Sequence, residues 1–175
     1  TFISSHHHQL SQTVEEIVEA AVNLSAKNVG AIIVIEKQVA LGEFIESGVK
    51  IDAQVKAALL ETIFYPGSPL HDLAVIIRGQ QVVAARVQLP LAELGGTGGS
   101  LGSRHRAAMG IACGSDAAAI VVSEETGIIS IAQDGKLDRH LTAEQLRARL
   151  TEIIVGHGDK GKNNPVRLSS SAEEN

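Results

Sequence analysis

The sequence predicts a single α/β domain in which helices flank a mixed central β-sheet. Helix-like and strand-like segments alternate at first along the chain, and strand pairs joined by tight turns follow them. The length of 175 residues suits one ordinary domain, and 44% hydrophobic against 20% charged residues is a globular composition. No internal repeat points to a different architecture.

The first predicted elements are a helix and a buried strand. Apolar residues recur at helical spacing from Leu10 to Leu24, with a capping-box pattern at 13–16 and a stop signal at 28–30. The apolar, β-branched run at 31–36 predicts a strand that is covered on both faces.

A looser segment over residues 41–48 comes next. Asp52 then resembles the N-cap of a second helix, which ends near Phe64 before two prolines. Beyond it the sequence predicts a hairpin, a third helix, two more strands and a last amphipathic helix. The hairpin covers residues 73–77 and 81–89, and the third helix covers residues 103–113. The two further strands cover residues 118–122 and 128–131, and the last helix is capped at Thr142.

Composition excludes several classes of function. Aromatic residues make up only 2% of the chain and the formal net charge is −5, which disfavours binding to a nucleic acid polymer by stacking or by a basic surface. The single Cys113 rules out an internal disulfide and a cysteine-based zinc site, and we expect it to be reduced and buried. The core must be aliphatic.

Polar segments border the predicted domain, which covers residues 10–155. Residues 1–9 are expected to be flexible, and His6–His8 are more typical of a terminal tract or a tag than of a native metal site. The tail 156–175 is expected to be disordered. No apolar stretch is long enough to span a bilayer, and the start at Thr1 instead of Met is consistent with a fragment.

Three short segments carry candidate chemistry. The glycine-rich loop 95–102 matches neither a dinucleotide-binding fingerprint nor a P-loop, but residues 103–106 place two arginines and a histidine at a helix start, where backbone N–H groups favour a polyphosphate. Alone, that motif is more often a solvated basic helix start.

The acidic turn at 69–72 precedes a predicted buried strand, and the acidic turn at 123–127 follows another. Together with His71, these turns offer ligands for a divalent cation.

Several motifs agree in order and spacing with one family. The chain resembles the diadenylate cyclase (DAC) domain, most closely that of the CdaA-type membrane-anchored enzymes, from about Thr13 to Ile154. The matching segments are GEFIESG at 42–48, PLHD at 69–72, LPL at 89–91, LGSRHRAA at 101–108 and VSEETG at 122–127.

The resemblance implies a metal-dependent condensation of two ATP molecules into cyclic di-AMP and two pyrophosphates, across a homo-oligomer with facing sites. Mn²⁺ or Mg²⁺ is expected, with Co²⁺ as a further option. A segment before Thr1 would place the domain on the cytoplasmic side of the membrane, whereas this fragment itself is expected to be soluble. The resemblance implies three overlapping sets of site residues. The implied catalytic residues are Asp72, Arg104, His105 and Arg106, and the implied metal ligands are His71, Asp72 and Glu125. The implied ATP-binding residues are Leu73, Ala74, Leu89, Gly102, Ser103, Arg104, His105, Arg106, Ser123 and Glu124.

Two departures from the family pattern leave alternatives open. Leu73 stands where the family has Gly, and it either blocks the ribose or opens the strand and points away. In the first case the domain is a degenerate module that binds ATP or cyclic di-AMP with little or no turnover. Ser103 replaces the usual Thr and keeps the hydroxyl. A third hypothesis is an unrelated structural α/β domain that binds no ATP. With few aromatic residues, the adenine would be held by aliphatic walls near Leu89.

Overall fold

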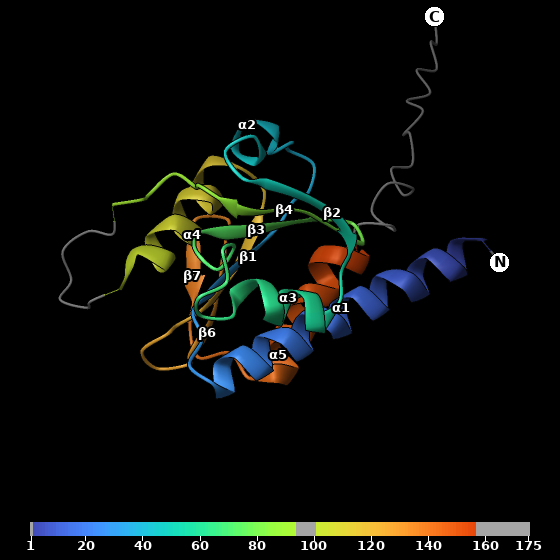
Figure 1. Cartoon of the computed structure of the whole chain (residues 1–175). Coiled ribbons are helices and arrows are strands. Elements are labelled where there is room, and N and C mark those ends of the chain that lie inside the picture. The colour runs from blue at the N-terminus through green and yellow to red at the C-terminus, as the bar shows by residue number, and fades with distance from the viewer. Residues whose placement is uncertain (1, 94–100, 157–175) are drawn as a thin grey trace, which may run out of the picture.

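The computed structural model describes residues 2–93 and 101–156, and its centre is a seven-stranded mixed sheet (Figure 1). The strands are β1 (Ala31–Ile35), β2 (Val49–Gln54), β3 (Ala74–Arg78), β4 (Gln81–Val87), β5 (Ala118–Val122), β6 (Ile129–Gln133) and β7 (Lys136–Asp138). Their order is β2-β4-β3-β1-β5-β6-β7, and only the β1–β3 pair is parallel. The predicted α/β class with a mixed sheet is confirmed.

Helices cover both faces of this sheet. The helices are α1 (Phe2–Ala26), α2 (Gly42–Ile45), α3 (Ala57–Phe64), α4 (Ser103–Gly114) and α5 (Ala143–Leu150), which runs on into a π-helical turn, η1 (Thr151–Val155). Helices α1, α3 and α5 pack on one face, and α2 and α4 pack on the other (Figure 1). No helix in the described ranges has the length and apolarity needed to cross a membrane.

The core is aliphatic, as the composition predicts. Among the described residues, Phe64 is the only aromatic side chain in it. All five residues of β1 are buried because the strand lies between β3 and β5 and is covered on both faces. The apolar stripe of α1 from Leu10 to Leu24 packs onto the same core as Phe64.

Two predicted turns and the predicted cap at Thr142 are confirmed, but the capping box predicted at 13–16 is wrong, because these residues lie inside α1 and the Thr13 hydroxyl donates to the Gln9 carbonyl at 3.1 Å. Gly79, with φ 57°, lies in the tight turn between β3 and β4. Asp134 and Gly135 both have positive φ (52° and 73°), as a two-residue hairpin turn requires, and they join β6 to the short strand β7, which the sequence did not reveal. Thr142 and Gln145 form a complete capping box at α5.

Two local predictions differ from the structure, and two others cannot be compared with it. Helix α1 begins at Phe2, not Leu10, so residues 2–9 continue the helix instead of forming an irregular segment. Most of these residues are exposed, and without an apolar stripe only propagation from the packed turns supports them. Cys113 is exposed on α4, not buried. The glycines at 95–99 and the tail 157–175 lie outside the described residues.

The start of α3 was also misplaced. Asp52 does not cap the helix; it lies in β2 with φ 50°, where the β2–β4 register shifts between Lys50 and Ala53. The helix begins five residues later at Ala57, whose N–H donates to Oε2 of Glu16 on α1 at 2.9 Å. A carboxylate from a distant helix therefore replaces the local cap.

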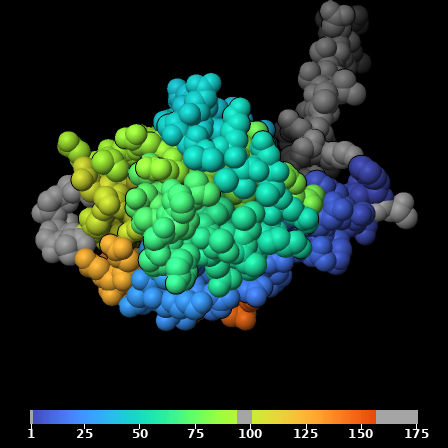
Figure 2. All heavy atoms as spheres, in the orientation of Figure 1, coloured from blue at the N-terminus to red at the C-terminus, as the bar shows by residue number. Residues whose placement is uncertain are grey.

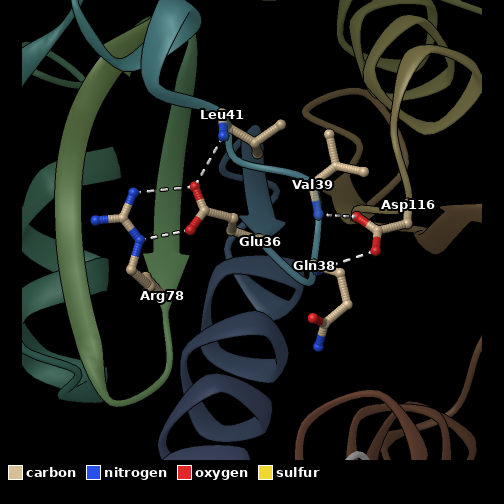
Figure 3. A network of polar contacts seen from close by, with 6 residues as sticks. All are labelled: Glu36, Gln38, Val39, Leu41, Arg78 and Asp116. Carbon is tan, nitrogen blue, oxygen red and sulfur yellow. Dashed lines mark hydrogen bonds and ion pairs between the residues drawn. The ribbon is translucent and has the colours of Figure 1, made fainter.

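Two carboxylates fix the loop that follows β1 (Figure 3). Glu36 accepts from Arg78 Nη2 and from the Leu41 N–H, both at 3.0 Å, while Asp116 accepts from the backbone N–H groups of Gln38 and Val39. The hydrogen bond from Arg78 is the main reason why the pKa of Glu36 lies below its ordinary value. This network anchors the end of β1 opposite to the site described next.

Candidate active site

Two neighbouring cavities lie where β1 and β3 begin and β4 ends. The larger, of about 680 Å³, is bounded by the α1–β1 loop, the end of α3, the segments around β3 and β4, and the start of α4. Figure 2 shows this side of the molecule, where the green segment around residue 70, the yellow start of α4 and the orange turn after β5 adjoin one another. The residues lining it are Asn28, Val29, Gly30, Ile32, Phe64, Pro66, His71, Asp72, Leu73, Arg86, Val87, Gln88, Leu89, Leu91, Ser103, Arg104, Ala107 and Glu124.

A compact turn orients His71 and Asp72 at the mouth of β3. Ser68 holds this turn, since its carbonyl accepts from the His71 backbone N–H at 3.2 Å and contacts His71 Nδ1 at 2.6 Å. A carbonyl oxygen only accepts, so Nδ1 carries the proton. His71 Nε2 lies 3.3 Å from Asp72 Oδ1, and this ring nitrogen and the carboxylate are available for proton transfer or metal ligation.

Leu73 adopts a conformation that costs energy. Its φ is 66°, in the left-handed region that leucine rarely occupies, its side chain is 43% exposed, and it lines the larger cavity. Strand β3 starts one residue later at Ala74, which is buried, pairs with Val87 and lines neither cavity. Leu73 therefore does not open the strand; it precedes the strand, on the wall of the larger cavity.

The start of α4 presents a positioned arginine and N–H groups that have no partner among residues 2–93 and 101–156. Gly102 is an extended N-cap without a side-chain hydrogen bond, so no side chain of the described part caps the first turn. Arg104 lies over Gly30, where an added Cβ would come within 2.7 Å of its Nε, and its Nη1 is 3.3 Å from Glu124 Oε2. Arg104 thus separates the two cavities and lines both.

Arg106 lies apart from Arg104 and His105, with which it was grouped in the predicted site. Its Nε donates to the carbonyl of Ala92 at 3.2 Å, and the Ala92 N–H donates to its carbonyl at 2.9 Å. These bonds tie α4 to the segment after β4, and Arg106 lines neither cavity. The structure gives it a bracing position.

The smaller cavity, of about 340 Å³, lies between the start of α4 and the turn after β5. Ser123 shapes this turn by accepting from the N–H groups of Glu125 and Thr126, both at 3.3 Å. The lining residues are Leu101, Gly102, Ser103, Arg104, His105, Ser123, Glu124, Glu125, Thr126 and Arg139.

His105 is the buried polar group of this smaller cavity. It is 5% exposed, and its Nε2 has no hydrogen-bond partner among the described residues. Burial lowers its pKa, and the positive charges of Arg139 and then Arg104 lower the pKa further, so the imidazole is neutral at pH 7. A neutral ring with an unpaired nitrogen can still hydrogen-bond to a ligand.

The predicted metal ligands are divided between the cavities. His71 and Asp72 line the larger cavity and Glu125 lines the smaller one. Within residues 2–93 and 101–156, no three His, Cys, Asp or Glu side chains stand close enough together to hold a metal ion by themselves. Oxygen donors of this kind suit Mg²⁺ or Mn²⁺ when phosphate oxygens supply the remaining ligands.

Sequence reasoning missed several residues that line the cavities. Gly30 was taken only as a helix stop, although its lack of a side chain makes room for Arg104. Arg86 and Arg139 carried no motif, because each is a single cation beside a strand end that only tertiary structure brings to the cavities. Most of the other predicted site residues do line one cavity or both.

The fold and the site define an α/β domain with a cation-bearing double cavity at the ends of inner strands of a mixed sheet, suited to an anionic ligand with an apolar part. A family model described as "DAC: DisA bacterial checkpoint controller nucleotide-binding" matches residues 18–137. The chain belongs to this diadenylate cyclase family. The hypothesis of an unrelated structural domain is therefore wrong.

Relatives and solved structures agree with this assignment. The chain is 42% identical over 139 residues to the cyclic di-AMP synthase CdaA of Bacillus subtilis, covering 79% of this chain and 51% of that protein. A crystal structure of a double mutant of DacA from Staphylococcus aureus superposes with a TM-score of 0.79 at 41% identity, over 81% of this chain and 95% of that one. A Bacillus cereus structure described as a hypothetical membrane spanning protein has a TM-score of 0.70 at 44% identity, and the match covers 73% of this chain and 63% of that chain. The chain spans about half the length of the curated relatives it matches.

Proposed function

We propose that this domain condenses two ATP molecules into cyclic di-AMP, with release of two pyrophosphates. The observation that carries the proposal is the placement of Asp72 and Arg104 on the walls of one cavity large enough for a nucleotide, in a chain whose 42% identical relative is named a cyclic di-AMP synthase. Leu89 and Leu91 on the same walls offer the apolar surface that an adenine needs.

The reaction joins two nucleotides through their own groups. The 3′-hydroxyl of one ATP attacks the α-phosphorus of the other; a ribose O–P bond forms and the bond to the β-phosphate breaks. The hydroxyl proton passes to the carboxylate of Asp72, which lines the larger cavity. Each nucleotide must both attack and be attacked, so two sites face each other in a homo-oligomer.

Phosphate binding falls to the start of α4. Arg104 and the free N–H groups beside Ser103 counter the charge that develops on the α-phosphate. We assign His71 and Asp72, together with Glu125 from the neighbouring cavity, to hold a divalent cation, Mn²⁺ or Mg²⁺ (or Co²⁺), with phosphate oxygens of the substrate. When bound, that ion supplies charge neutralisation and favours loss of the 3′-hydroxyl proton.

A second candidate function rests on Leu73. A side chain at this place in the cavity, on a backbone strained to φ 66°, favours a degenerate domain that binds ATP or cyclic di-AMP with little turnover.

We also propose that the full-length protein is anchored on the cytoplasmic side of the cell membrane by a segment before Thr1. The similarity to the Bacillus cereus structure described as a membrane spanning protein supports this proposal.

One experiment decides between the two functions. The domain is incubated at high concentration with ATP and Mn²⁺, and cyclic di-AMP is measured by chromatography. We expect product, and Asp72→Asn is expected to lower the rate by about 10²–10⁴-fold, the usual contribution of a general base. No product from the natural chain, together with product from Leu73→Gly, would establish the degenerate domain instead. Absence of ATP binding would overturn both functions.

A further inference from the structure

The smaller cavity contains a cation that the family motifs do not include. Arg139 follows strand β7 and lines this cavity together with the start of α4. It is exposed, and it forms no ion pair within the described ranges. Arg147 and Arg149, a few residues further along, are both paired with carboxylates, at 2.7 and 2.6 Å. Arg139 therefore differs from its neighbours in having a charge available to a ligand.

A second observation points independently to a ligand in this cavity. His105 is 5% exposed, and the part of the chain that the structure describes gives its Nε2 no partner, although buried polar atoms are nearly always hydrogen-bonded. Arg139 and Arg104 line the same cavity as His105, and the positive charges of both lower the pKa of His105. A ligand with several oxygen atoms would satisfy the guanidinium of Arg139, and the unpaired Nε2 belongs to a residue on the wall of the same cavity.

The relation between the two cavities indicates which part of a ligand lies where. They share Ser103, Arg104 and Glu124, so an extended molecule can pass from one to the other at this wall. The larger cavity has apolar walls and offers Asp72, whereas the smaller one adds the guanidinium of Arg139 and N–H groups at the start of α4. A nucleoside suits the first, and a chain of phosphates suits the second.

We propose that Arg139 binds the β- and γ-phosphates of the nucleotide, and that the smaller cavity holds the pyrophosphate group before it leaves. This inference rests on the proposed function, because it assumes that the α-phosphate lies at the wall near Arg104. It adds a substrate-binding residue from the end of β7, a part of the sheet outside the motifs that identify the family.

The test compares ligands that differ only in their phosphates. Binding of 3′-deoxy-ATP and 3′-deoxy-AMP is measured by calorimetry with Mn²⁺, since neither carries the attacking hydroxyl and neither can be consumed. Arg139→Gln is expected to weaken triphosphate binding about tenfold or more, the usual effect of losing a charge-assisted hydrogen bond, and to leave monophosphate binding unchanged. Inhibition of turnover by added pyrophosphate should weaken in parallel.

The control is Lys136→Gln, which removes an exposed cation from the same strand at a position that lines neither cavity. It should leave both affinities as in the natural chain. Equal behaviour of the two variants, or an equal loss of both ligands in Arg139→Gln, would overturn the inference. If the natural chain binds neither nucleotide, the proposed function itself fails; if it binds both equally tightly, only the inference fails.

Discussion

Replacing Leu73 separates two effects that this residue has on the cavity. Its side chain occupies the cavity wall, and its backbone, at φ 66°, is held in the left-handed region. Leu73→Ala removes most of the side chain but keeps the backbone cost, whereas Leu73→Gly removes both. The difference between these two variants therefore measures the backbone contribution alone.

The expected difference in stability follows from two opposing quantities. A left-handed conformation costs a non-glycine residue about 1–2 kcal/mol, and glycine loses about 0.5–1 kcal/mol more entropy than alanine on folding. The glycine variant should thus be more stable than the alanine variant by about 0.75 kcal/mol, the middle of a range of about 0–1.5 kcal/mol. For a domain of this size, about 0.75 kcal/mol corresponds to about 1.5–3 °C in Tm. Urea or thermal unfolding of both variants measures this difference.

Activity of the same pair shows how Leu73 acts on the reaction. If the side chain alone obstructs the ribose, both variants should form cyclic di-AMP faster than the natural chain. If the strained backbone displaces Asp72, only Leu73→Gly should gain. An alanine variant at least as stable as the glycine variant would refute the left-handed assignment, and with it the proposal that a strained backbone displaces Asp72.

The remaining predictions concern three other positions. Glu36→Gln should lower the free energy of unfolding by about 1–3 kcal/mol at pH 7, since it weakens a charged hydrogen-bond network. Because the folded-state pKa of Glu36 is lowered, the stability that this carboxylate contributes is present above its ordinary pKa of 4.5 and is lost as pH falls through the folded-state value. The stability of the variant should therefore vary less with pH in that acidic range than the stability of the natural chain. Thr142→Ala should cost about 1 kcal/mol of stability in urea unfolding by removing the α5 cap. Gly30→Ala should displace Arg104 and weaken ATP binding in calorimetry, whereas Gly42→Ala, with no atom within 4 Å of its added Cβ, should not.

Local signals predicted much of the fold, and tertiary contacts explain the exceptions. Strand β5 was predicted to the residue because five consecutive buried apolar residues have no competing helical pattern. The start of α3 could not be found, because its cap is the carboxylate of Glu16, 41 residues away, while Asp52 offered a better local signal. Strand β7 has only three residues and one partner, which is too short for alternation to show.

The candidate site was predictable where short motifs contain it, and not where distant segments meet. His71, Asp72 and Arg104 were found because each lies in a motif at an element boundary. The position of Arg106 could not be inferred, since which side chains of a helix start face a cavity depends on the segment packed against it, here at Ala92. Arg139 had no local signal for the same reason.

The distribution of backbone strain supports the larger cavity as the working site. Of the six non-glycine residues with positive φ in the described ranges, Asn28, Leu73 and Arg86 line this cavity. Asn28 carries little cost, because asparagine tolerates this conformation after a helix end. Leucine and arginine do not tolerate this conformation as asparagine does, so Leu73 and Arg86 carry its full cost. Arg86 lies where an extra residue interrupts the β3–β4 pairing. The strain at Arg86 is what a wall shaped for a ligand would store, whereas the strain at Leu73 falls where the family has glycine and belongs to the case for reduced turnover.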